Sequence, residues 1–231
     1  MKEITNENIS QLAGLFLIDY SKGLAQKGNS LTEDTISVAN AVFSSELSPD
    51  EKVEALDKAI EKFPLLAPIS EFLFDMLTIG ILLGESDSNP SETLESPEWD
   101  EFEERNIDRG TELLNLLVYL RDCAENKVSP TLEDFLYEFL LVEEDDFQDE
   151  FFLYESVVQN SGLVESSPEE IITKGMKIAE GELAELFVPF FLFFHQLQKP
   201  EKGTDELILK LDPQPELSYA LYRFLVNFNG E

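Results

Sequence analysis

The sequence has very few of the residues from which disulfide frameworks, metal centres and nucleophilic active sites are built. Its 231 residues include one cysteine, Cys123, and one histidine, His195. A single cysteine excludes an internal disulfide and a cysteine-rich metal site. A single histidine excludes the two Glu-x-x-His pairs of a di-iron helical bundle. A Ser-His-Asp or Cys-His enzyme would therefore have to use His195.

Basic residues are also scarce. The chain has 16 Lys and Arg against 48 Asp and Glu, which gives a formal net charge of −32. A field of this sign repels nucleic-acid backbones and anionic membranes, and it attracts basic proteins and cations. We therefore expect a basic protein as the partner, with no direct binding to nucleic acid or to a membrane.

Motifs for phosphate binding and hydrolysis are missing as well: there is no P-loop, GxGxxG, HExxH or GxSxG. The longest apolar run, residues 72–83, is interrupted by Asp75, and we expect it to be too short to span a bilayer. The first ten residues, MKEITNENIS, lack the basic-then-apolar order of a signal peptide. The sequence thus favours a soluble, cytoplasmic protein without a cofactor.

What the sequence does have is apolar residues with helical spacing along almost its whole length. With 43% hydrophobic residues and 18 phenylalanines, it can form a sizeable core. We predict an all-α fold, a globular multi-helix bundle of about ten helices. Ser-Pro pairs recur at 48, 96, 129 and 167, so irregular α-solenoid-like stacking is the alternative.

Individual helices are marked by their start signals and apolar faces. Residues 48–51, Ser-Pro-Asp-Glu, predict a capping box with proline at the first helical position. Residues 69–83 predict a helix that is apolar all round and lies at the centre of the core. A long helix is expected from residue 97 to about Asn126, while 204–211 is undecided between strand and helix. The helix over 6–27 is expected to bury Leu12, Leu15, Phe16, Ile18 and Leu24.

The predicted domain organisation has three parts. Residues 1–84 form an N-terminal helical region around the apolar core helix. Residues 85–97, ESDSNPSETLESP, are polar and turn-rich, and are expected to be an exposed loop or linker. Residues 98–231 contain the acidic and C-terminal helices. We expect this last region to pack with the first as one domain.

The excess acid is concentrated in the middle of the chain. Residues 85–170 contain 26 acidic and four basic residues. Within them, segment 132–163 predicts two amphipathic helices joined near Glu144, with an anionic rim that faces water. A second acidic run follows Trp99. The candidate partner-binding residues are Glu143, Glu144, Asp145, Asp146, Asp149, Glu150, Asp100, Glu101, Glu103 and Glu104.

An acidic face without compensating bases slightly destabilises a helix, because like charges four residues apart repel each other. Such a face therefore indicates a role outside the fold. Immunity proteins, antitoxins and nucleic-acid mimics use surfaces of this kind, with carboxylates in place of phosphates. The carboxylates would pair with Arg or Lys and would steer association. The competing interpretation is a surface that only confers solubility.

A magnesium enzyme is the second functional hypothesis. Glu51 and Glu54 lie three residues apart on one predicted helix, and Glu71 and Asp75 lie four apart on the next. All-carboxylate ligands suit Mg²⁺. The arrangement resembles the paired carboxylates of all-helical nucleotide pyrophosphohydrolases, although that family has a spacing of three in its second pair. No basic cluster for a triphosphate is near.

A third hypothesis concerns the segment from Phe190 to His195. Five large apolar residues precede the histidine. Small-molecule pockets are mostly apolar with a few polar groups. The segment could therefore bind an apolar small ligand, or His195 could simply be packed among aromatic rings at a helix end.

Overall fold

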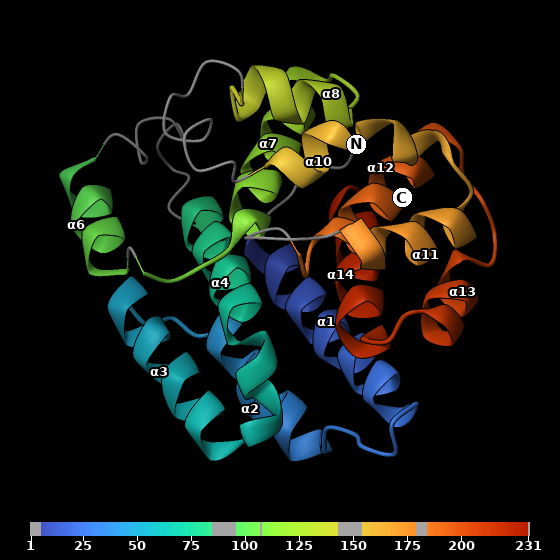
Figure 1. Ribbon diagram of the computed structural model, residues 1–231. Helices are drawn as coiled ribbons and strands as arrows, with labels where there is room; N and C mark the ends of the chain where they lie inside the picture. The colour runs from blue at the N-terminus through green and yellow to red at the C-terminus, as the bar shows by residue number, and fades with distance from the viewer. Residues whose placement is uncertain (1–5, 85–95, 107, 143–153, 179–183, 231) are drawn as a thin grey trace. The chain divides into compact units, whose positions relative to one another are not determined.

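The structure, a computed structural model, describes residues 6–84, 96–106, 108–142, 154–178 and 184–230 (Figure 1). Every secondary-structure element within these ranges is helical, and they contain no β-strand. The predicted all-α fold is therefore confirmed. Residues 85–95 of the predicted linker lie outside the described residues.

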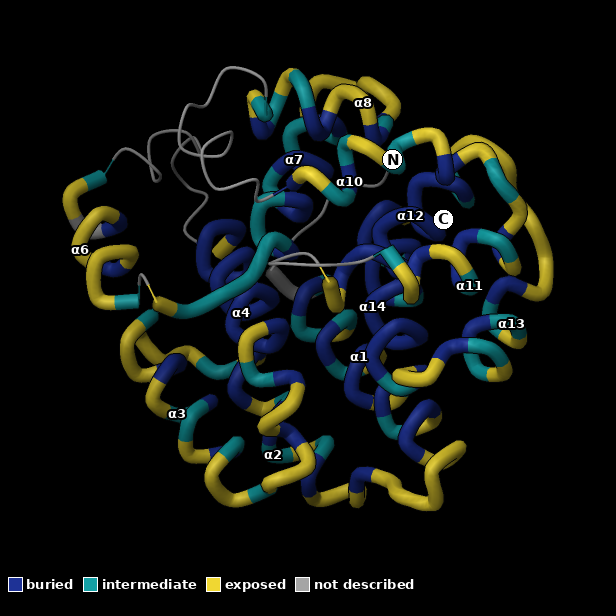
Figure 2. The backbone as a smooth tube through the Cα atoms, in the orientation of Figure 1, coloured by how far each residue is buried: buried dark blue, intermediate teal, exposed yellow. Residues whose placement is uncertain are grey.

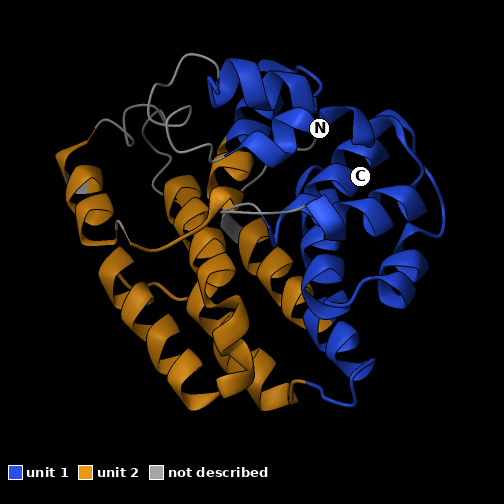
Figure 3. Ribbon diagram, in the orientation of Figure 1, with its two compact units in different colours: residues 1, 19–30, 119–231 blue, residues 2–18, 31–118 orange. Residues whose placement is uncertain are grey.

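The chain forms two compact units (Figure 3). Unit 1 comprises residues 1, 19–30 and 119–231, and unit 2 comprises residues 2–18 and 31–118. The boundaries fall inside helices α1 (Asn6–Ala25) and α7 (Glu112–Asn126). Unit 2 includes residues on both sides of segment 85–97, and the predicted organisation into regions 1–84, 85–97 and 98–231 stays a prediction.

Unit 2 is built around one apolar helix. It contains α2 (Glu33–Phe43), α3 (Pro49–Lys62), the 3₁₀ helix η1 (Pro64–Ile69), α4 (Ser70–Gly84) and α6 (Pro97–Asn106), together with the beginnings of α1 and α7. Helix α2 packs on α3, and α3 packs on α4. Every residue of α4 from Phe72 to Leu83 is buried (Figure 2). The prediction of a helix buried all round is confirmed.

Local sequence signals determine where these helices begin. The Glu51 carboxylate accepts hydrogen bonds from the Ser48 N–H at 2.9 Å and from the Ser48 hydroxyl at 2.8 Å. Pro49 occupies the first position of α3, where its missing N–H needs no partner. The predicted capping box is therefore present.

The stretch around α4 is longer than its apolar run indicated. Because η1 continues directly into α4, residues Pro64–Gly84 form one helical stretch of 21 residues. By length and composition alone this longer stretch could cross a membrane, whereas residues 72–83 by themselves are too few. However, 72% of its most apolar window is buried within the protein, as in the core helix of a soluble domain.

The single helix predicted from residue 97 to Asn126 is wrong. Two helices are present, α6 and α7, and the chain between them turns at Gly110, which has a φ of +91°. Thr111 then begins α7, its hydroxyl accepting from the Leu113 N–H at 3.1 Å. Glycine adopts this left-handed conformation without steric cost, whereas other residues do so at a cost.

The buried face of α1 also differs from the prediction. Leu15 and Ile18 are 45% and 51% exposed, while Phe16 and Leu24 are buried as expected. Leu12 is partly buried. The core positions that the prediction missed are Ile9, Ala13, Leu17 and Tyr20. Apolar residues occupy adjacent positions in α1, so the sequence is compatible with two neighbouring apolar faces. It does not indicate which of the two faces is buried.

Unit 1 has its core in the C-terminal helices. Its elements are α8 (Leu132–Asp134), the π-helix η2 (Phe135–Phe139), α10 (Glu155–Gln159), η3 (Ser161–Glu165), α11 (Pro168–Ile178), α12 (Phe187–Gln198), α13 (Thr204–Leu211) and α14 (Pro215–Phe228). Helix α12 packs on α14 and α11. The undecided segment 204–211 is thus a helix. The predicted junction near Glu144 lies outside the described residues.

Candidate functional site

The acidic residues with candidate roles fall into two groups. Glu143, Glu144, Asp145, Asp146, Asp149 and Glu150 lie outside the described residues. Asp100, Glu101, Glu103 and Glu104 all lie on α6, and all four are exposed. Helix α6 is therefore the part of the predicted surface whose geometry can be described.

Two aromatic rings fix α6 to unit 2. Trp99 and Phe102 are 4% and 5% exposed, and their ring centroids are 5.3 Å apart. Phe102 also stacks on Phe74 of α4, with centroids at 6.4 Å. The Ser96 hydroxyl accepts from the Trp99 N–H at 3.2 Å and caps the first turn. Because the rings are three residues apart, they occupy one face of α6 and leave its carboxylates exposed (Figure 2).

The four carboxylates of α6 have different surroundings. Glu103 accepts a hydrogen bond from the Trp99 indole N–H at 2.7 Å. Glu101 lies 3.7 Å from Arg105, whose Nη2 also contacts both carboxylate oxygens of Asp50 at 3.1 Å. For the carboxylates of Asp100 and Glu104, the described part of the chain supplies no hydrogen bond or ion pair.

A hollow of about 380 Å³ lies beside this face. Pro49, Ile81, Trp99 and Phe102 form its apolar walls, and Asp50, Glu101 and Arg105 provide its charged groups. Sequence analysis missed it. The residues come from the start of α3, the end of α4 and the length of α6, so only tertiary packing brings them together. The nearest signal was the Ser-Pro-Asp-Glu motif that places Asp50 in the first turn of α3.

The four carboxylates of the magnesium hypothesis do not converge. Glu51 belongs to the capping box, and Glu54 pairs with Lys58 at 3.2 Å. Glu71 is exposed, whereas Asp75 is fully buried. Among the described residues, no group of three or more His, Cys, Asp or Glu side chains could hold a metal ion. The magnesium hypothesis stays a prediction without an assembled ligand set.

Asp75 has a structural partner instead. Its two carboxylate oxygens accept from the Thr111 N–H at 3.1 and 3.0 Å, and one accepts from the Thr111 hydroxyl at 2.6 Å. The carboxylate thus holds the turn that begins α7. Burial raises the pKa of Asp75 to about 8, against the lowering effect of the Thr111 hydrogen bonds.

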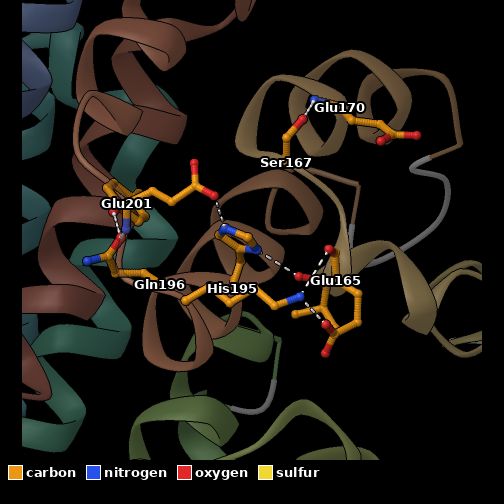
Figure 4. A network of polar contacts seen from close by, with 9 residues as sticks. Glu165, Ser167, Glu170, His195, Gln196 and Glu201 are labelled. Atoms are coloured by element: carbon orange, nitrogen blue, oxygen red, sulfur yellow. Dashed lines mark hydrogen bonds and ion pairs between the residues drawn. The ribbon is translucent and has the colours of Figure 1, made fainter.

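His195 lies in a network of polar contacts at the end of α12 (Figure 4). The ring is 2% exposed; its Nδ1 is 2.9 Å from the Val164 carbonyl oxygen, and its Nε2 is 3.6 Å from Glu201. In the Nδ1–H form it donates to that carbonyl and joins α12 to η3. Lys199 contacts the Glu165 carboxylate beside it. These contacts support a packing role for the histidine.

The apolar segment that precedes His195 is occupied by its own rings. Residues 190–194 are each at most 4% exposed. Phe135 of η2 packs against Phe190 and Phe194, with ring centroids at 6.3 and 6.2 Å. Phe191 stacks on Phe187 at 4.2 Å. The rings thus pack against one another in the core of unit 1, and the apolar-ligand hypothesis stays a prediction.

No protein-family model, curated protein or solved structure matches the chain. The functional assignment therefore depends on the geometry and charge of the chain itself.

Proposed function

We propose that the protein is a cytoplasmic protein-interaction module that binds a basic surface of another protein through the acidic face of α6. The predicted cluster at 143–150 would be a further acidic contact for such a partner. The partner would be of the kind that immunity proteins, antitoxins or nucleic-acid mimics recognise, a protein with clustered Arg and Lys.

The observation that carries this proposal is the separation of roles on α6. Trp99 and Phe102 attach the helix to unit 2, and Glu103 supports the indole of Trp99. The carboxylates of Asp100 and Glu104 have no partner within the described residues, and they repel each other at a spacing of four. Exposed, unpaired carboxylates are the groups that steer a basic partner.

The test compares two variants with the same loss of charge. Asp100→Asn with Glu104→Gln removes two carboxylates from α6. Glu61→Gln with Glu138→Gln removes two exposed carboxylates elsewhere and serves as the control. Wild type and both variants are used to capture partners from a cytosolic extract, and each captured basic protein is then purified and its association rate measured.

We expect the α6 variant to associate several-fold more slowly than the control, and the difference to shrink as salt is added. The proposal predicts that the α6 variant loses basic proteins that the control variant retains. Equal capture by wild type and both variants would contradict a binding role for this face.

A further inference from the structure

We infer that the hollow beside α6 receives an arginine side chain of the basic partner, its stem against the apolar walls and its guanidinium at the acidic rim. This inference rests on the proposed function and adds the group that is recognised. The hollow combines two features that such a side chain needs, apolar lining residues and two carboxylates among the residues that line it.

The walls suit the stem of a long cationic side chain. Pro49, Ile81 and Phe102 present apolar surface, and Trp99 adds an aromatic ring. Lys and Arg pack their methylene groups on surface of this kind while the charged end stays in water. A guanidinium is also attracted to aromatic faces, most strongly to that of tryptophan. A neutral side chain of the same length, such as citrulline, would keep the methylene packing but lose the cationic attraction to the ring and to the carboxylates.

The rim shows that the carboxylates here can bind a guanidinium. Arg105 contacts both oxygens of Asp50 at 3.1 Å and lies 3.7 Å from Glu101. One arginine thus serves two carboxylates, so the rim keeps a net negative charge. The three side chains are 51%, 61% and 74% exposed, respectively. Exposed ion pairs exchange at little cost, which allows an incoming arginine to share Asp50 or Glu101.

Arginine fits this rim better than lysine does. Its planar guanidinium pairs with a carboxylate through two parallel hydrogen bonds, and it stacks on aromatic rings. An ammonium group interacts as a point charge. We therefore expect an arginine-containing segment to bind more tightly than the same segment with lysine.

The chain contains a built-in reporter for this test. Trp99 is its only tryptophan, and it lines the hollow. The probe is a capped peptide with several arginines and no aromatic residue, titrated into the full chain while tryptophan fluorescence is followed. Peptides with citrulline or lysine in place of arginine are the matched probes. Binding is measured in parallel by calorimetry, which does not depend on Trp99.

Two pairs of substitutions locate the site. Glu101 lines the hollow and Glu104, on the same helix, does not. Glu101→Gln should raise the Kd of the arginine peptide roughly tenfold and reduce the fluorescence change, whereas Glu104→Gln should raise the Kd about twofold. Arg105→Gln frees Asp50 and Glu101, so it should lower the Kd several-fold. A stability defect common to all variants would not reproduce these opposite signs.

The outcomes separate this inference from the proposed function. An arginine peptide that binds and changes the Trp99 fluorescence, with citrulline inactive and lysine weaker, supports both. Salt-sensitive binding in calorimetry with no Trp99 response, and equal effects of Glu101→Gln and Glu104→Gln, overturns the arginine site and leaves the acidic surface intact. An equal response to the citrulline peptide also overturns it, because the hollow would then accept neutral side chains. Absence of any binding to basic peptides overturns the inference and counts against the proposed function.

Discussion

Asp75 is a carboxyl group in the middle of a helix that is otherwise apolar all round. Its contacts with the Thr111 N–H and hydroxyl join α4 to the start of α7 within unit 2. Those hydrogen bonds favour the charged form, and burial favours the neutral form. Because burial is the larger effect, the pKa of Asp75 is raised from 3.8 to about 8.

This raised pKa makes the free energy of unfolding depend on pH. Between about pH 4 and pH 8 the folded state keeps a proton that the unfolded state releases, so this contribution to stability falls as pH rises through that window. Asp75→Asn cannot titrate. Urea denaturation of wild type and Asp75→Asn at a series of pH values should show that the wild type loses more stability with rising pH than the variant does. Parallel curves would mean that Asp75 stays ionised in the fold.

At the level of secondary-structure elements, the connection between helices α6 and α7 depends on the backbone conformation of Gly110. Its φ is +91°, and a β-carbon there would lie 2.7 Å from a carboxylate oxygen of Asp75. Nearby, Arg109 donates to both oxygens of Asp57 at 2.7 and 3.1 Å and lies 4.6 Å above the ring of Phe74. The chain is thus held on both sides of the glycine.

Alanine substitutions at three glycines distinguish the cost of a positive φ from the cost of a steric clash at the new β-carbon. Gly110→Ala combines an unfavourable φ with a clash, so it should destabilise by roughly 2 to 4 kcal/mol. Gly28 has a φ of +78° and no atom near its missing β-carbon, so Gly28→Ala should cost about 1 to 2 kcal/mol. Gly162→Ala, with open space and no positive φ, should change stability by less than about 0.5 kcal/mol. Chemical denaturation checks the order. An equal loss for Gly110 and Gly28 would show that the contact with Asp75 is relieved.

Signals that act over a few residues were predictable from the sequence. The Ser48 capping box and the start of α3 follow from side chains three residues apart, and the burial of α4 follows from composition. The break at Gly110 had a local signal that the prediction missed, because Ile107 is the single apolar residue between Phe102 and Leu113 and glycine followed by threonine favours a helix boundary. Its tertiary contact, Asp75, is distant in sequence. The hollow beside α6 was missed because the residues that line it are likewise distant in sequence. Exposure of the four α6 acids was predictable, since the aromatic rings fix the buried face.

The whole molecule has far more acid than its bases can neutralise, and the three arginines of residues 85–170 are already paired. Arg105 contacts Asp50, Arg109 contacts Asp57, and Arg121 contacts Glu125 at 2.8 Å. These are three of the four bases in residues 85–170. Acids at 143–150 therefore find little uncommitted positive charge among them, and like-charge repulsion is expected to oppose folding. Repulsion between exposed charges is screened by salt.

Replacing Glu144, Asp145, Asp149 and Glu150 by Gln or Asn tests whether this cluster serves the fold or a partner. If it serves a partner, the variant should melt at or above the wild-type temperature at low salt, because repulsion is relieved and exposed carboxylates add little stability. Its advantage should disappear as salt is added. If the acids instead cap helices, each lost cap should cost about 1 kcal/mol.

A lower melting temperature of the quadruple variant can be interpreted with the help of Arg121. Its Nη1 is buried without a hydrogen-bond partner among the described residues, as is the Nε of Arg223. The Arg121 guanidinium therefore has a donor left for a carboxylate. The four substitutions are therefore repeated in an Arg121→Gln background. If the quadruple variant melts well below wild type and this loss vanishes in the Arg121→Gln background, the cluster pairs with Arg121 and is part of the fold. If the quadruple variant is as stable as wild type but associates more slowly with a basic protein, the cluster takes part in binding that protein.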